Sequence, residues 1–314
     1  MKDAIVTVFG GGGFVGRYVV QELFAGGEGP RVRIAQRDVR SATFLRPLGS
    51  LGQNQFIATD ITRKESVARA VAGANAVVNL VGSFQNMLTV QAEGAQIVAR
   101  AATEAGVTTL VHVSAIGADP ESRSEYGRSK GLGEQAVREA FPSATILRPS
   151  IVFGREDAFT NRFAGMLGLP IVPVVRGSTK FQPVFVADLA KAIAQAVDDP
   201  QRHAGKTYEI GGPEQIAMRD LLGRLAGWTG ASPRFVGLPD PAAGGIARFG
   251  GWLPGAPITW DQWLMLQHDN VVSAGADGLE AFGITPTPLA AVAPSWLVRF
   301  RKQGRFGGVK TVES

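Results

Sequence analysis

The chain has 314 residues, of which 45% are hydrophobic and 19% are charged, a composition typical of globular proteins. It contains no cysteine and only three scattered histidines, which excludes disulfides, iron–sulfur clusters and cysteine-based zinc sites and disfavours other metal sites. The formal net charge is +5, but the basic residues are spread along the chain except in the tail 296–310, so the charge alone identifies no acidic partner.

The N-terminus predicts a cytoplasmic protein without a membrane span. The opening "MKDAIVTVFGG" passes directly into an apolar strand, with neither the pattern of a signal peptide nor an Arg/Ser-rich transit segment. No uncharged apolar run reaches the length that a bilayer requires. We therefore expect a cytoplasmic location.

The first half of the chain alternates short β-branched runs with longer Ala-rich stretches. Strands are expected at 4–9, 31–36, 54–59, 75–80, 109–114 and 144–149, and helices near 14–25, 64–72, 88–105 and 125–140. Apolar strands that alternate with helices are typical of a parallel sheet covered on both faces. The pattern therefore predicts an α/β fold with a doubly wound parallel sheet.

The glycine run "FGGGGFVGR" (9–17) lies between the first expected strand and the first expected helix. Its Gly10, Gly13 and Gly16 have the spacing G-x-x-G-x-x-G. Without Cβ atoms the turn can tighten and the backbone can approach a pyrophosphate, which the N–H groups and dipole of the helix start then bind. The run predicts the dinucleotide site of a Rossmann domain; the alternative is a flexible turn without a ligand.

The predicted site extends over the whole turn. Its two apolar residues, Phe14 and Val15, are also expected to pack the helix against the sheet. Its members are Gly10, Gly12, Gly13, Phe14, Val15 and Gly16.

The end of the second strand bears on the choice of dinucleotide. An NAD site usually places an acid there for the ribose 2′-hydroxyl, whereas an NADP site places an arginine. Here Gln36 and Arg37 occupy that position and Asp38 follows. Arg37, together with Arg17 or Arg40, would pair with a 2′-phosphate. This favours NADP(H) over NAD(H); the alternative is that Arg37 is a solvated loop residue and Asp38 holds the ribose.

A tyrosine–lysine pair, Tyr126 and Lys130, lies in "EYGRSKGLGE". Residues at i and i+4 share one face of a helix, and a nearby ammonium lowers the pKa of a tyrosine from about 10 towards values useful in acid–base catalysis. Ser114 ends the fifth strand and is a third candidate catalytic residue. The alternatives are a cofactor clamp without catalysis and, for Ser114, an ordinary hydroxyl at a strand end.

Together, the glycine spacing and the Y-x-x-x-K pair resemble the short-chain dehydrogenase/reductase superfamily, in its extended or atypical branch. The resemblance implies that Lys130 also holds the nicotinamide ribose and that Ser114 orients a substrate carbonyl. Further cofactor contacts implied by the resemblance, in "ATDIT", "VNLVG" and "LRPSIVFG", are Asp60, Ile61, Val81, Pro149 and Val152.

The regular pattern ends near residue 154. We expect a loop-rich insertion over 155–182, including the stretch 167–179, then a strand turning into a helix over 183–199 and a last strand over 206–212. Glycine and proline interrupt short helical stretches beyond this point. The predicted domains are an NAD(P)-binding Rossmann domain over 1–212 and a small C-terminal part over 213–314, which binds a substrate or a partner.

Three further stretches, 153–166, 260–289 and the tail, narrow the resemblance. With "FGGGGFVGRYVV" they are similar to the nucleotide-binding accessory subunits of respiratory complex I (NADH:ubiquinone oxidoreductase) and their bacterial relatives. This resemblance implies a tightly held, structural NADPH, contact with complex I subunits, and a place near the membrane at the inner face. Close relatives are linked instead to ubiquinone biosynthesis.

Two functions therefore remain open. One is an accessory subunit or assembly factor that holds NADP(H); the other is an active NADP(H)-dependent oxidoreductase or epimerase-like enzyme, in ubiquinone metabolism, that uses Tyr126, Lys130 and Ser114. No nucleic-acid partner is expected. The basic, aromatic tail over 296–310 predicts a peripheral membrane contact, with a solvated terminus as the alternative.

Overall fold

The computed structural model describes residues 4–25, 29–251, 258–302 and 304. The chain divides into two compact units, each built from three segments. Unit 1 comprises Met1–Pro149, Val186–Ile210 and Val272–Thr285, and unit 2 comprises Ser150–Phe185, Gly211–Val271 and Pro286–Ser314. The two units are described separately.

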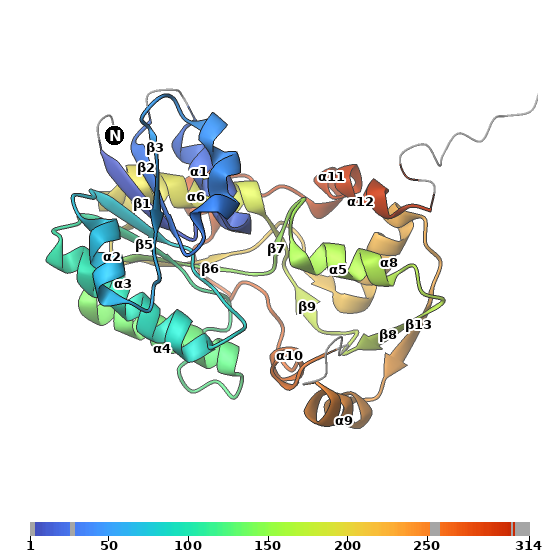
Figure 1. Cartoon of the computed structure of the whole chain (residues 1–314). Coiled ribbons are helices and arrows are strands. Elements are labelled where there is room, and N and C mark those ends of the chain that lie inside the picture. The colour runs from blue at the N-terminus through green and yellow to red at the C-terminus, as the bar shows by residue number, and fades with distance from the viewer. Residues whose placement is uncertain (1–3, 26–28, 252–257, 303, 305–314) are drawn as a thin grey trace, which may run out of the picture. The chain divides into compact units, whose positions relative to one another are not determined.

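Unit 1 contains a parallel sheet of seven strands in the order β11-β6-β5-β4-β1-β2-β3 (Figure 1). The strands are β1 (Ile5–Phe9), β2 (Arg31–Gln36), β3 (Asn54–Ala58), β4 (Ala76–Asn79), β5 (Thr109–Val113), β6 (Thr145–Pro149) and β11 (Thr207–Ile210). Val6, Val8, Val32 and Ile34 are completely buried, because helices cover both faces of a parallel sheet. The predicted doubly wound fold is confirmed.

Helices cover both faces of this sheet. On one face α2 (Lys64–Val71), α3 (Gly94–Glu104) and α4 (Glu125–Ala140) pack in sequence, and α1 (Phe14–Leu23) and α6 (Val186–Asp198) pack together on the other. Shorter helical segments are η1 (Val39–Leu48), η2 (Leu88–Glu93), α7 (Pro200–His203) and η3 (Leu279–Phe282).

The helix expected at 88–105 begins with a π-helical turn, η2, before α3 continues it. The wider turn brings the carbonyl oxygen of Gln91 against α4, where a Cβ on Gly133 would lie only 2.3 Å from that oxygen. The absence of a side chain at Gly133 therefore permits this close approach, which the periodicity of apolar residues did not indicate.

Unit 2 is built from short elements. Its strands form three pairs: β7 (Val152–Phe153) with β10 (Val184–Phe185), β9 (Lys180–Phe181) with β12 (Ile216–Ala217), and β8 (Ile171–Val175) with β13 (Arg234–Leu238). Its helical segments are α5 (Ala158–Met166), α8 (Met218–Thr229), α9 (Asp240–Gly250), α10 (Trp260–Met265), α11 (Leu289–Val292), α12 (Pro294–Leu297) and η4 (Val298–Phe300). Its main core gathers Phe153, Leu167, Val172, Leu221, Leu225, Trp296 and Leu297.

The stretch 167–179, expected to be loop-rich, contains strand β8. Pro173 lies inside this strand, opposite Val236 of β13, and a proline is tolerated there because a two-stranded sheet leaves one side of each strand without a ladder partner. Strand β11 is the last strand of the large sheet, as expected, but β12 and β13 follow it in unit 2.

The segment 272–285 belongs to unit 1. The backbone N–H of Ser273 donates to Glu209 Oε2 at 2.7 Å, and that of Glu209 donates to the carbonyl oxygen of Asp277 at 3.0 Å. These bonds attach the segment to β11. Among the helices of the described ranges, none is long and apolar enough to cross a membrane.

Candidate functional site

The predicted dinucleotide site lies at the carboxyl ends of β1 and β4, which are neighbours in the sheet. After β1 the chain forms β2 and β3 on one side of this strand, and it then crosses to the other side of β1 to form β4. Ligands of open α/β sheets bind at such a topological switch point. The two strand ends meet closely, because a Cβ on Gly10 would lie 3.6 Å from the side chain of Val81.

The glycine run forms a tight turn before α1. Gly10 has a φ of +78°, and its carbonyl oxygen accepts a hydrogen bond from Gly13 N at 2.9 Å. A Cβ on Gly16 would lie 2.3 Å from that same oxygen, so only glycine fits there. Helix α1 has Gly13 as its N-cap and no side-chain cap. The N–H groups of its first turn are therefore suited to the pyrophosphate of a dinucleotide.

Gly12 has a different environment. Its backbone N–H donates to Gln36 Oε1 at 2.8 Å, and the side-chain amide of Gln36 donates in turn to Ser41 Oγ at 2.9 Å. Gln36 thus joins the glycine turn to the start of η1. The sequence placed Gln36 at the ribose position without indicating this role, since no motif marks it.

The two apolar residues after the glycines do not seat the helix as expected. Phe14 and Val15 are only partly buried, and Phe14 meets Tyr18 edge to face at 6.2 Å between ring centroids. The buried side of α1 is formed instead by Val19, Val20 and Leu23, since these positions point towards the sheet one to two turns further along.

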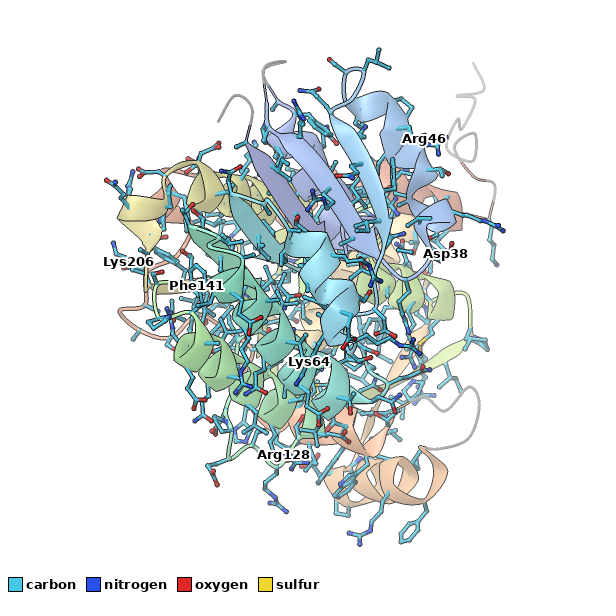
Figure 2. The ribbon with its side chains drawn as sticks, turned by 60° about the vertical axis from the view of Figure 1, so that its left-hand side comes forward. Asp38, Arg46, Lys64, Arg128, Phe141 and Lys206 are labelled. Atoms are coloured by element: carbon cyan, nitrogen blue, oxygen red, sulfur yellow. The ribbon has the colours of Figure 1, made fainter. Side chains whose placement is uncertain are left out.

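Arg37 is exposed just after β2. The neighbouring Asp38 caps η1, because its Oδ1 accepts the backbone N–H of Arg40 at 3.0 Å; Figure 2 shows Asp38 at the beginning of this helix and Arg46 towards its end. One carboxylate oxygen of Asp38 is therefore engaged locally, while Arg37 carries a positive charge at the position next to the predicted ribose.

Asp60 follows β3 and is held by a turn. Its Oδ1 accepts hydrogen bonds from the N–H and the hydroxyl of Thr62, at 3.0 and 2.7 Å. These bonds are the main cause that lowers the pKa of Asp60, and the charges of Arg63 and Arg37 lower it further. Asp60 and Arg37 are thus within electrostatic reach of each other. Ile61 is 7% exposed and packs in the core.

The tyrosine–lysine pair lies in the first turns of α4. Ser124 caps this helix by accepting the N–H of Gly127 at 3.2 Å. Tyr126 is partly buried, whereas Lys130 is only 5% exposed and donates from Nζ to the carbonyl oxygen of Val113 at 3.2 Å. Burial lowers the pKa of Lys130 to about 8, against an opposing effect of the Glu134 carboxylate. A large part of its population remains a cation near neutral pH.

Glu134 is itself held in place by Arg148. The guanidinium donates from Nε to Oε1 at 2.9 Å and from Nη2 to Oε2 at 2.6 Å, a two-pronged arrangement that fixes the carboxylate. The charge that acts on Lys130 therefore has a defined position one helical turn away.

Ser114 and His112 lie at the end of β5. Ser114 is 3% exposed, and its Oγ has no hydrogen-bond partner among the described residues. Asn79 accepts the N–H of Val81 with Oδ1 and approaches Nδ1 of His112 with Nδ2 at 3.2 Å, which assigns the His112 proton to Nε2. Burial, with a smaller effect of Lys130, lowers the pKa of His112 to about 3.

The loop after β4 adds an aromatic residue that the sequence did not single out. The ring of Phe84 stacks on the ring of Tyr126, with a centroid separation of 5.1 Å and an interplanar angle of 18°. Phe84 belongs to no motif, and Asn79 lies in "VNLVG" without having been singled out there, so the structure identifies both.

The two remaining predicted contacts lie in different units. Pro149 ends β6 in unit 1, is buried, and accepts the N–H of Ile116 at 3.0 Å. Val152 is in β7 of unit 2, opposite Val184 of β10. The structure therefore brings the glycine turn, Arg37, Asp60, Val81, Ser114, Tyr126, Lys130 and Pro149 into one unit.

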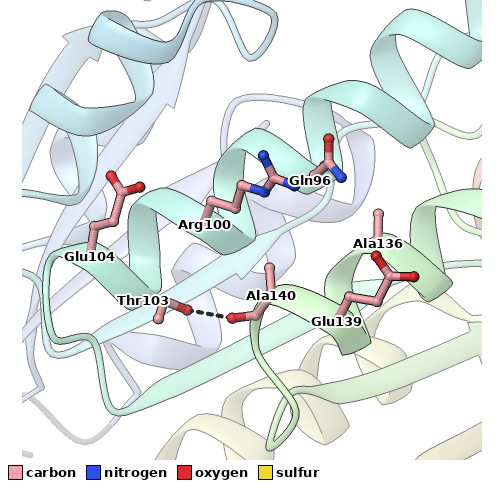
Figure 3. Close-up of a pocket in the computed structure, with 7 residues that line it drawn as sticks. All are labelled: Gln96, Arg100, Thr103, Glu104, Ala136, Glu139 and Ala140. Carbon is pink, nitrogen blue, oxygen red and sulfur yellow. Dashed lines mark hydrogen bonds between the residues drawn. The ribbon is translucent and has the colours of Figure 1, made fainter.

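A pocket of about 190 Å³ between α3 and α4 is a separate feature. Figure 3 shows its lining, with Arg100 and Glu104 on α3, Glu139 on α4, and the hydrogen bond from Thr103 Oγ1 to the carbonyl oxygen of Ala140 at 2.7 Å. The pocket is formed by α3 along most of its length, from Gln96 to Glu104, and by the carboxyl end of α4, whereas Tyr126 lies at the amino end of α4. It is therefore not part of the predicted cofactor site.

Comparisons with known proteins agree with this fold. The signature of the NAD dependent epimerase/dehydratase family matches residues 6–211. In solved structures, the chain resembles NADPH-dependent quinone oxidoreductase QOR2 from Escherichia coli, with a TM-score of 0.76 and 19% identity, covering 93% of this chain and 99% of that one. Triphenylmethane reductase from Citrobacter sp. gives a TM-score of 0.74 at 20% identity with the same coverage.

The similarity to curated sequences includes the C-terminal part of the chain. The chain is 38% identical to NADH dehydrogenase [ubiquinone] 1 alpha subcomplex subunit 9 of Mus musculus, over 96% of this chain and 81% of the relative. The subunit of the same name from Arabidopsis thaliana is 34% identical, over 98% and 81%. The chain therefore belongs to the NAD dependent epimerase/dehydratase family, as a homologue of the alpha subcomplex subunit 9 proteins of NADH dehydrogenase [ubiquinone].

Proposed function

We propose that this protein is an accessory subunit or assembly factor of NADH:ubiquinone oxidoreductase and that it holds one NADP(H) molecule tightly, as a structural cofactor. The observation that carries the proposal is the similarity to the subunit 9 proteins, at 38% identity over 96% of the chain. The similarity extends over unit 2 as well as unit 1.

The environment of Arg37 supports NADP(H) over NAD(H). Asp38 uses one of its two carboxylate oxygens, Oδ1, to cap η1, which leaves one oxygen fewer to accept the ribose hydroxyls. The exposed guanidinium of Arg37 lies beside it and within reach of Asp60. A 2′-phosphate would find the cation of Arg37 at this position.

The residues of unit 1 fit a dinucleotide. A bound nicotinamide would supply or accept a hydride. The first turn of α1 would bind the pyrophosphate, Lys130 would hold a ribose, and Pro149 would bound the nicotinamide end of the site. Tyr126 and Lys130 stand at i and i+4 of α4, where an ammonium would favour a phenolate, so the pair would hold or pass a proton at the Tyr126 hydroxyl.

The second candidate is an active NADP(H)-dependent reductase or epimerase-like enzyme, working in ubiquinone metabolism. The intact pair of Tyr126 and Lys130 favours it, since the buried Lys130 has a pKa of about 8. The ceramide reductase of Caulobacter vibrioides, 28% identical over 76% of this chain, is a relative whose name denotes a reductase.

The proposed location is the inner face of the membrane, through contact with complex I subunits and a peripheral contact of the tail. Trp296 and Leu297 are buried in the core of unit 2, so this contact would begin with the basic residues that follow them. Arg301 donates to the carbonyl oxygen of Trp228 at 3.0 Å. Residue 303 and residues 305–310 of the predicted contact lie outside the described residues.

The test is affinity purification of the tagged protein from gently solubilised membranes of its host. Subunits that elute with it are identified by mass spectrometry, and nucleotide is released by denaturation and quantified. Complex I subunits together with about one NADP(H) per chain would support the accessory role. A free protein that exchanges nucleotide rapidly and reduces quinone precursors would instead favour the enzyme.

A further inference from the structure

Gln91 is a buried polar residue of the π-helical turn η2 that is not among the predicted cofactor contacts. It is only 2% exposed. Its carbonyl oxygen lies against Gly133 of α4, and its side-chain nitrogen Nε2 donates to Ser129 Oγ, one helical turn earlier on α4, at 3.0 Å. Gln91 is therefore held against α4 at two points.

The orientation of the Gln91 amide follows from its bond to Ser129. The hydroxyl of Ser129 donates its hydrogen to the carbonyl oxygen of Tyr126 at 2.9 Å. Ser129 Oγ must then accept in its bond with Gln91, so the amide nitrogen faces it and the amide oxygen does not. That oxygen, Oε1, is a buried acceptor without a hydrogen-bond partner among the described residues. A buried acceptor costs free energy unless a ligand or a water molecule donates to it.

Gln91 and Lys130 face the same small space beside Gly82, the residue after Val81. A Cβ on Gly82 would lie 3.7 Å from Gln91 Oε1 and 3.8 Å from Lys130 Nζ. Apart from the chain neighbours of Gly82, no other described atom lies within 4 Å of that position. The ammonium of Lys130 has three N–H groups, and one donates to Val113, so two remain for a ligand.

The two polar groups at this space have complementary requirements. Gln91 Oε1 needs a donor, and the ammonium of Lys130 needs an acceptor. A hydroxyl group donates and accepts, so a single hydroxyl satisfies both. An ionised phosphate oxygen has no hydrogen for Gln91, and a second ammonium has no lone pair for Lys130. The space therefore suits a hydroxyl group.

We propose that Gln91 binds a ribose hydroxyl of the dinucleotide, with Oε1 accepting its hydrogen while Lys130 donates to its oxygen. The inference rests on the proposed function, in which Lys130 holds a ribose, and it adds Gln91 as a second binding residue for the same sugar. The unpartnered oxygen of Gln91 is satisfied when the nucleotide is bound, which favours the bound state.

The order of the strands identifies which ribose is meant. Arg37 and Asp60 follow β2 and β3, on one side of β1, where the proposed contacts to the adenosine half lie. Lys130 is bonded to the carbonyl oxygen of Val113 in β5, on the other side of β1. The hydroxyl therefore belongs to the ribose of the nicotinamide half, and Gln91 contributes nothing to the binding of the adenosine half.

The first test compares two nucleotides by calorimetry, in the full chain from which bound nucleotide has been removed. NADPH contains both riboses, whereas 2′,5′-ADP contains the adenosine half with its 2′-phosphate and lacks the second ribose. Gln91→Met keeps the length of the side chain and removes the acceptor. It should lower the affinity for NADPH about 3- to 10-fold, as expected for one hydrogen bond, and leave the affinity for 2′,5′-ADP unchanged.

The matched control is Gln96→Met, the same substitution in α3 beside the separate pocket, which should alter neither affinity. Equal losses for both nucleotides in Gln91→Met would make Gln91 a structural residue and overturn the inference. An unchanged affinity for NADPH would show that Oε1 binds water alone, which equally refutes it.

The second test alters the space and leaves Gln91 in place. Gly82 does not have a positive φ, and an added Cβ would meet its neighbours at ordinary contact distances, so Gly82→Ala and Gly82→Ser should both fold. The serine hydroxyl would come within reach of Gln91 Oε1 and Lys130 Nζ and compete with the ribose. Gly82→Ser should therefore bind NADPH about 3- to 10-fold more weakly than Gly82→Ala. Identical affinities would contradict a hydroxyl site at this position.

The inference and the proposed function fail in different ways. If the unaltered chain binds neither NADPH nor 2′,5′-ADP, the proposed function is wrong and the inference falls with it. If the unaltered chain binds both and Gln91→Met binds NADPH equally well, the inference alone is wrong.

Discussion

The ammonium group of Lys130 donates to the carbonyl oxygen of Val113 at 3.2 Å, from a side chain that is only 5% exposed. Burial lowers its pKa to about 8 in the folded protein, from the ordinary value of 10.5. Between these values the unfolded chain binds a proton that the folded chain has lost, so stability rises with pH over this interval.

This relationship predicts that the pH dependence of stability changes when Lys130 is replaced. In the nucleotide-free protein, Lys130→Met should remove up to about 3 kcal/mol of the gain in unfolding free energy between pH 8 and 10.5. Urea unfolding at both pH values measures it. Lys191→Met, at an exposed position of α6, is the matched control and should keep the original slope. A parallel slope in Lys130→Met would contradict the depressed pKa.

A second prediction concerns acid. His112 is buried and neutral, because burial lowers its pKa to about 3 from the ordinary value of 6.5. Below pH 6.5 the unfolded chain binds a proton at this histidine and the folded chain does not. The unfolding free energy therefore falls as the pH decreases, by about 1.4 kcal/mol per pH unit. His112→Gln should flatten this fall between pH 6.5 and 5, and the exposed His268→Gln should not. Burial also lowers the pKa of His203. This residue therefore accounts for the slope of stability against pH that remains in His112→Gln.

A third prediction concerns the turn before α1. Gly16→Ala places a methyl group 2.3 Å from the carbonyl oxygen of Gly10, so it should lower the unfolding free energy by about 1–3 kcal/mol and weaken NADPH binding. Gly223→Ala in α8 meets nothing within 4 Å and should be neutral or stabilising by up to about 1 kcal/mol. Thermal unfolding and NADPH titration of both variants provide the comparison. Tight NADPH binding by Gly16→Ala would argue against the role given to this turn.

A fourth prediction addresses the choice of cofactor. Arg37→Gln removes the proposed partner of the 2′-phosphate and should weaken NADPH binding about 10-fold or more while leaving NADH binding unchanged. Arg31→Gln, at the exposed opposite end of β2, should affect neither. If both nucleotides weaken equally in Arg37→Gln, the preference has another origin.

A fifth prediction separates holding the cofactor from using it. Tyr126→Phe should retain NADPH within about 2-fold, because the removed hydroxyl is assigned to proton transfer. Any carbonyl reduction should fall by about 10²- to 10⁴-fold. Turnover that persists in this variant would remove Tyr126 from the chemistry, and loss of NADPH would show that the hydroxyl is part of the binding site.

Unit 1 was largely predictable from the sequence because its elements carry local signals. Near-continuous β-branched runs such as that of β1 lie where expected, and glycine turns separate them from the helices. The glycine run and the tyrosine–lysine pair also have fixed spacing, so their elements could be placed without knowledge of the tertiary structure.

The rest depends on contacts between residues distant in sequence. The stacking of Phe84 on Tyr126 and the bond of Gln36 to the glycine turn join different loops, and neither has a local pattern. Unit 2 was less predictable, since its strand pairs are short and Pro173 interrupts the apolar signal of β8.

The discontinuous course of the chain has a consequence for its synthesis. The sheet of unit 1 lacks its edge strand β11 until residue 210 has been made, and Glu209 gains its bond to Ser273 only later still. A nascent chain that ends at Pro149 would leave the edge of β6 unpaired and open to pairing with other chains, a known hazard for aggregation. Folding on the ribosome therefore cannot be completed segment by segment, and the earliest stretch translated depends on one of the last.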